Sequence, residues 1–123
     1  MRKYSLLYTT LGLAILLWVL NLIALTLYLY WTMGWYDIMM HFLGGITIGM
    51  LVIWFLKIED RSLKSFLTAV AWVIVVGGAY EVFEYVNDLT FSTQEYSIDT
   101  AIDLVMDALG AIFAYWRATS PSQ

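Results

Sequence analysis

The sequence begins with an apolar stretch that is long enough to cross a membrane. Residues 4–31, YSLLYTTLGLAILLWVLNLIALTLYLYW, contain no charged side chain. A transmembrane helix needs about 20 apolar residues, and this run exceeds the ~7–15-residue core of a signal peptide. The whole chain of 123 residues is 62% hydrophobic and only 13% charged. A soluble domain of this length could not bury so much apolar surface, so we expect an integral membrane protein in a lipid bilayer.

Four apolar segments predict an all-α membrane protein with four transmembrane helices in a compact bundle. The chain is expected to form a single transmembrane domain over residues 1–123, with spans at residues 4–31, 37–56, 65–86 and 99–116. A short turn at 32–36, broken by Gly34, is expected to join the first two spans. A charged loop at 57–64 and a polar loop at 87–98 join the others.

The basic residues predict how the four spans are oriented. With four spans, both termini and the loop at 57–64 lie on the same side of the membrane. All six basic residues fall on that side, namely Arg2, Lys3, Lys57, Arg61, Lys64 and Arg117. The positive-inside rule makes this side cytoplasmic. We therefore expect a protein of the cell (inner) membrane, with both termini cytoplasmic and the loop at 87–98 facing outward.

The last span carries a row of aspartates. Asp99, Asp103 and Asp107 recur every four residues, so they share one face of a helix. Gly110 and Ala114 continue this face with small side chains, which allow a neighbouring helix to approach closely. Charged groups in a span cost at least ~2.5 kcal/mol each near its centre unless they turn inward and are neutralised.

Two other spans carry polar residues at a matching depth. Asp37 and His41 are four residues apart, and Glu81 and Glu84 are three apart, so each pair shares a helix face. At a rise of 1.5 Å per residue, His41, Glu81 and Asp103 all lie roughly 7 Å inside the outer boundary. Small residues follow on roughly the same faces, namely Gly44, Gly45, Gly49, Gly77 and Gly78. The sequence thus predicts one polar site, open to the outside, between tightly packed helices.

The acids of this predicted site have no basic partner in the outer half of the bundle, where His41 is the one candidate cation. Packed carboxylates cannot all stay ionised in a low dielectric. A bound divalent ion (Mg, Mn, Ca, Fe or Zn) would neutralise them. Shared protons or a solvated, purely structural cluster are the alternatives. The candidate metal ligands are His41, Glu81, Glu84, Asp103, Asp37, Asp99 and Asp107.

The candidate ligands differ in how specific their positions are. Glu81, Glu84 and Asp103 lie well inside helices, so helix capping does not explain them. Asp37 and Asp99 lie at helix N-termini, where Asp often caps the helix or complements its dipole. Of these acids, Asp107 lies deepest in the membrane, and it would either support a metal ligand by contact with it or take part in a proton transfer. His41 and Glu84 are the candidate catalytic residues, as general base or ligand.

These motifs resemble those of VanZ-like membrane proteins, and more closely those of the uncharacterised YjdF-like inner-membrane proteins. The resemblance covers about residues 37–111 and rests on D-x-x-x-H, E-x-x-E and a terminal D-x-x-x-D. YjdF-like proteins show T-Q-G-D-x-W-D-T-x-x-D-M before the last span. The matching positions here are Thr93, Gln94, Asp99, Thr100 and Asp103, whereas Glu95, Ile98 and Leu104 depart from the pattern. The resemblance implies a compact helical protein of the cell envelope and supplies no activity.

Three functions follow from these expectations. The first is a membrane enzyme whose divalent metal acts on a lipid or lipid-linked envelope substrate. The second is a proton- or cation-coupled transporter, for which buried acids are normal, although the inner halves of the spans offer no polar path unless a homo-oligomer builds a pore. The third is a non-catalytic envelope protein that metal stabilises. Nucleic acid is not expected as a partner, because the chain has no basic patch.

Overall fold

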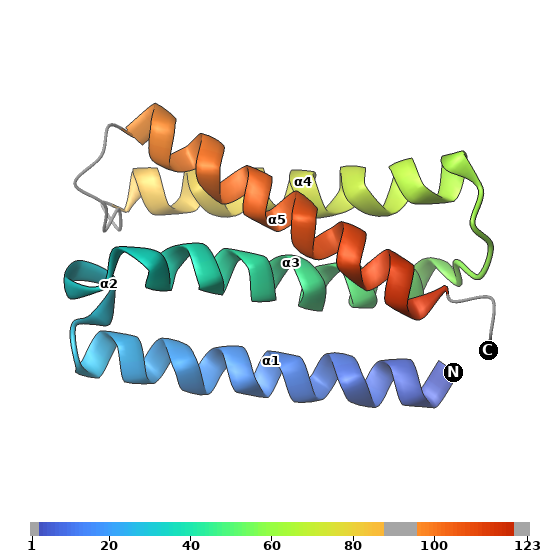
Figure 1. Cartoon of the computed structure of the whole chain (residues 1–123), viewed down its shortest axis with the longest axis horizontal. Coiled ribbons are helices and arrows are strands. Elements are labelled where there is room, and N and C mark those ends of the chain that lie inside the picture. Colours follow the sequence, from blue (N-terminus) through green and yellow to red (C-terminus); the bar gives the residue numbers. More distant parts are fainter. Residues whose placement is uncertain (1–2, 88–95, 120–123) are drawn as a thin grey trace.

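The computed structural model describes residues 3–87 and 96–119, and all regular structure in these residues is helical. Figure 1 shows the long helices running along one common direction, with the last of them inclined across the others. They are α1 (Lys3–Thr26), α2 (Leu29–Thr32), α3 (Gly34–Leu56), α4 (Leu63–Val86) and α5 (Tyr96–Ala118). The predicted all-α class is confirmed for the described residues.

Three helices, α1, α3 and α4, are long and apolar enough to cross a membrane. Their hydropathy follows from uninterrupted runs of aliphatic and aromatic side chains. Helix α5 is as long as α3, but its aspartates and Arg117 make it less apolar. Composition therefore supports three of the four expected spans and does not confirm α5 as the fourth.

The first helix ends at Thr26, well before the expected end at residue 31. The chain turns at Leu27 and Tyr28, and Tyr28 adopts a left-handed conformation with φ 58°. Gly34 does not break a helix as expected but begins α3. The residues at this turn are all apolar or aromatic, so the sequence pattern does not indicate where the first helix ends. Hydrogen bonds hold it in place, because the Tyr30 hydroxyl donates to Asn21 Oδ1 of α1 at 2.8 Å.

Helix α3 lies at the centre of the molecule, with α1 on one side and α4 and α5 on the other (Figure 1). Its contact with α5 is especially close. A Cβ atom added at Gly45 would collide with the backbone of Asp107, and one added at Gly110 would collide with the backbone of Phe42. The close approach that the small residues predict is therefore present between these two helices.

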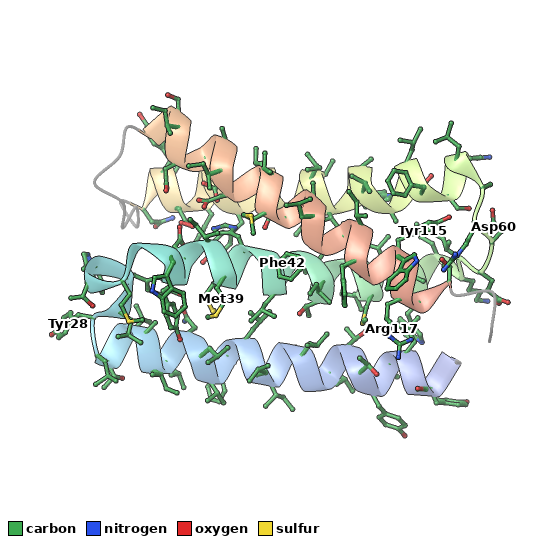
Figure 2. All side chains as sticks on the ribbon, viewed as in Figure 1. Tyr28, Met39, Phe42, Asp60, Tyr115 and Arg117 are labelled. Carbon is green, nitrogen blue, oxygen red and sulfur yellow. The ribbon has the colours of Figure 1, made fainter. Side chains whose placement is uncertain are left out.

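The end of the bundle opposite α2 holds the start of α1, the end of α5 and the loop after α3 (Figure 1). Arg61 of this loop donates from Nε to the carbonyl of Thr119 at 2.7 Å and from Nη2 to that of Trp116 at 2.9 Å. The Tyr115 hydroxyl donates to the carbonyl of Asp60 at 3.0 Å, and Figure 2 shows these two residues together. The loop thus ties the start of α4 to the C-terminal end of α5.

Candidate metal centre

His41 of α3 lies at the centre of a ring of carboxylates from three helices. Its Nε2 atom is 3.3 Å from Asp103 Oδ2, and 3.7 Å from both Asp37 Oδ1 and Glu81 Oε2. Its Nδ1 atom is 3.1 Å from Asp107 Oδ1. The side chain is only 9% exposed. Both ring nitrogens therefore face acidic oxygen atoms inside the bundle.

Helical spacing and the close contact of α3 with α5 bring these groups together. Asp37 and His41 share one face of α3 because they are four residues apart. Asp103 and Asp107 have the same spacing on α5, so that one lies at each nitrogen of the imidazole. The glycine contacts between the two helices bring the α5 backbone close enough for both carboxylates to reach the ring.

The cluster includes buried oxygen atoms of two α5 aspartates that have no hydrogen-bond partner among the described residues. They are Oδ1 of Asp103 and Oδ2 of Asp107, and these residues are 1% and 6% exposed. Gly77 of α4 leaves room for the Asp107 atom, since an added Cβ there would collide with it. A charged oxygen atom that is buried without a partner is costly, and a cation bound among these carboxylates would offset that cost.

The geometry fits a metal ion. Asp37, His41 and Asp103 offer one ligand atom each within 4.8 Å of one another, and so do His41, Glu81 and Glu84. Ligands held at ~2.0–2.2 Å from an ion lie roughly 3–4 Å apart, so small side-chain movements would complete either set. His41 belongs to both sets, which makes it the centre of the candidate site.

The structure brings together all but one of the predicted site residues. Asp99 lies in the first turn of α5, is partly buried and belongs to neither ligand set. The position fits a carboxylate that complements the helix dipole. Thr100, which the spacing of the acids does not reveal, donates a hydrogen bond to Glu81 Oε1 at 3.3 Å. Its sequence signals are its place directly after Asp99 in the D-T-x-x-D pattern and its place one turn before Asp103 and Leu104.

A cavity of about 490 Å³ lies beside the centre. We call it the α1–α4 groove, because α1 and α4 supply its two walls and α3 lies between them. His41, Glu84 and Asp107 line it. The Tyr80 ring, whose centroid is 6.5 Å from that of His41, lines it too.

These features define a class: a helical membrane protein with a buried histidine–carboxylate group that is able to hold a metal. The sequence matches the family described as "Predicted membrane protein (DUF2238)" over residues 1–120, and the chain belongs to this family. No curated protein matches the chain, and no solved structure matches it.

Proposed function

We propose that this protein holds a divalent metal ion at His41 and uses the ion on a lipid or lipid-linked substrate of the cell envelope. One observation carries the proposal: acids from α3, α4 and α5 surround both nitrogens of a single buried imidazole. No Lys or Arg occurs at residues 4–56 or 65–116, the segments that supply these acids. Salt bridges to basic side chains of these segments are therefore unavailable.

The two nitrogens of His41 have different roles in this proposal. A histidine that binds a metal through one nitrogen commonly donates its other N–H group to a carboxylate. Asp107, at 3.1 Å from Nδ1, is placed to accept that hydrogen bond. Nε2 would then carry the lone pair that binds the ion, together with oxygens of Asp37, Glu81 and Asp103. Oxygen ligands with one imidazole suit Mg, Mn, Ca, Fe or Zn.

Glu84 is the group that we assign to proton transfer. It lies in a ligand set with His41 and Glu81 and also lines the α1–α4 groove, from which a substrate would approach. A divalent ion polarises a phosphoryl or carbonyl oxygen and lowers the pKa of bound water. Glu84 would accept or return the proton, and Asp107 would hold His41 in the required orientation. To accept and return a proton, Glu84 must not itself bind the ion.

The membrane arrangement is part of the same proposal. Helix α5 forms the fourth span, since its acids face the bundle interior while Val105, Leu109 and Trp116 are exposed. The end with the termini and the loop at 57–62 faces the cytoplasm, as its basic residues favour. The metal centre then lies toward the outer face of the inner membrane.

Elemental analysis tests the metal. The wild-type protein, purified in mild detergent, is compared with a Glu81→Gln/Asp103→Asn double variant and with Asp99→Asn, which removes an acid outside both ligand sets. We expect a stoichiometric divalent metal in the wild type and in Asp99→Asn and its loss in the double variant. A stable wild type that contains no metal and regains none on dialysis would contradict the proposal. Shared protons would then neutralise the acids, and a transport function would take its place.

A further inference from the structure

The α1–α4 groove has one apolar part and one polar end. Its apolar walls come from Leu17 and Leu25 of α1 and from Val73 and Val76 of α4, and Ile48 of α3 lies between them. Figure 1 shows α1 and α4 on opposite sides of α3. From Asp37 to Ile48 the groove follows α3 for roughly 16 Å, at 1.5 Å per residue. An elongated apolar ligand would fit along this direction.

The groove opens sideways between α1 and α4. Several of its lining residues are also largely exposed: Trp18 is 64% exposed, Tyr80 52% and Val76 40%. These residues lie within helices that are apolar enough to span a membrane. The open side of the groove therefore faces the hydrocarbon of the bilayer, where lipid chains are the available molecules.

The polar end of the groove is the metal centre itself. His41, Glu84 and Asp107 line the same cavity as the apolar walls. A ligand that fills both parts must be amphiphilic, with its head at the centre and its chain between α1 and α4. Carboxylates repel an anionic head, but a divalent ion among them would accept a phosphate oxygen as a ligand.

We propose that the α1–α4 groove binds the hydrocarbon chain of a single-chain lipid phosphate whose phosphate head coordinates the metal at His41. This inference rests on the proposed metal centre and specifies its substrate class. The cavity of about 490 Å³ falls within the ~300–1,000 Å³ range of small-ligand sites. Two helices bound it, one on each side, and leave a channel for one chain.

Manganese binding provides the test, because two ligands that bind in contact raise each other's affinity by the same factor. The affinity of the purified full chain for Mn²⁺ is measured by electron paramagnetic resonance. The added probes are dodecyl phosphate, inorganic phosphate and the uncharged dodecanol. We expect dodecyl phosphate to raise the affinity about tenfold, inorganic phosphate to raise it far less, and dodecanol to leave it unchanged.

Two glycine variants provide matched controls. A Cβ at Gly44 meets no atom within 4 Å, and Gly44 lines the groove, so Gly44→Leu should fill the groove without displacing a carboxylate. Gly78 has the same open surroundings on α4 but does not line the groove. Gly44→Leu should keep the basal Mn²⁺ affinity and lose the gain from dodecyl phosphate. Gly78→Leu should keep the basal affinity and the gain. Any chelation of Mn²⁺ by free dodecyl phosphate in solution affects the two variants equally, so it cannot produce a difference between them.

The outcomes separate the two proposals. A wild type that binds no Mn²⁺ would overturn the metal centre. A wild type that binds Mn²⁺ while inorganic phosphate and dodecyl phosphate act equally would overturn the groove inference alone. A gain that persists in Gly44→Leu would also overturn it, since the chain would then bind elsewhere.

Discussion

Asp107 Oδ1 lies 3.1 Å from His41 Nδ1, across the contact between α5 and α3. This distance allows the carboxylate to hold the Nδ1–H group, which would leave Nε2 free to bind the proposed metal ion. An Asp107→Asn variant replaces the charged acceptor with a neutral amide that holds the imidazole less firmly. We expect the metal affinity to fall by about 10–100-fold, as for other groups that orient a metal-binding histidine.

The comparison with two other aspartates distinguishes orientation from ligation. Asp103→Asn removes a proposed ligand and should lower the affinity more than Asp107→Asn does. Asp99→Asn, on the same helix but in neither ligand set, should leave it unchanged. Titration of Mn²⁺ measures all three. An Asp107→Asn protein with wild-type affinity would show that this carboxylate does not orient the ring.

Substitution by alanine should have different effects on stability at the two adjacent glycines of α3, Gly44 and Gly45. A Cβ at Gly45 would collide with the backbone of Asp107, whereas one at Gly44 would meet nothing within 4 Å. Gly45→Ala should therefore force α3 and α5 apart and cost about 1–3 kcal/mol. Gly44→Ala should be neutral, or stabilise the helix by up to about 1 kcal/mol through its higher helix propensity.

Thermal unfolding in mild detergent tests the pair, with metal content measured on the same samples. Because Gly45 faces the backbone of Asp107, its substitution should also reduce metal binding. Equal midpoints for the two variants would mean that the contact between α3 and α5 adapts without cost.

The site was predictable where it depends on helix geometry alone. The spacing of Asp37 and His41, and of Asp103 and Asp107, fixes which side chains share a face, whatever the helices pack against. The distance from Asp107 to Nδ1 was not predictable. It depends on how far α5 is shifted and rotated against α3, and the contact at Gly45 determines this in three dimensions.

The turn at Tyr28 is a part of the fold that the sequence likewise does not predict. The apolar run continues through residues 27–31 without a polar or glycine signal, so composition alone gives one long helix. The turn is held by tertiary hydrogen bonds, among them the bond from the Tyr36 hydroxyl to the carbonyl of Leu20 at 2.8 Å. Such bonds join residues distant in sequence, and no local pattern reveals them.

The start of α4 should weaken at low pH. Hydrogen bonds from Ser62 and Ser65 lower the pKa of the exposed Asp60 carboxyl to about 2. Because the pKa is lower in the folded protein than the ~3.9 of a free aspartate, these bonds stabilise the fold fully above about pH 4 and are lost as the pH falls through about 2. An Asp60→Asn variant lacks this dependence.

Amide hydrogen exchange at Ser65 and Phe66, corrected for the intrinsic effect of pH, follows this change. At about pH 5 the wild type should be better protected than Asp60→Asn, and the two should converge as the pH falls toward about 2. A difference that stays constant over this range would show that the carboxylate does not hold the first turn of α4.

Single cysteines test the orientation of the bundle, because the chain contains no cysteine of its own. Ser97→Cys introduces an exposed thiol at the start of α5, and Glu59→Cys introduces one in the loop at the opposite end. We expect a membrane-impermeant maleimide to label Ser97→Cys in intact spheroplasts and Glu59→Cys only after permeabilisation, since basic residues favour the cytoplasmic side. The reverse pattern would place the metal centre toward the cytoplasm, and labelling of both thiols from one side would show that α4, which separates the two positions in the chain, does not cross the membrane.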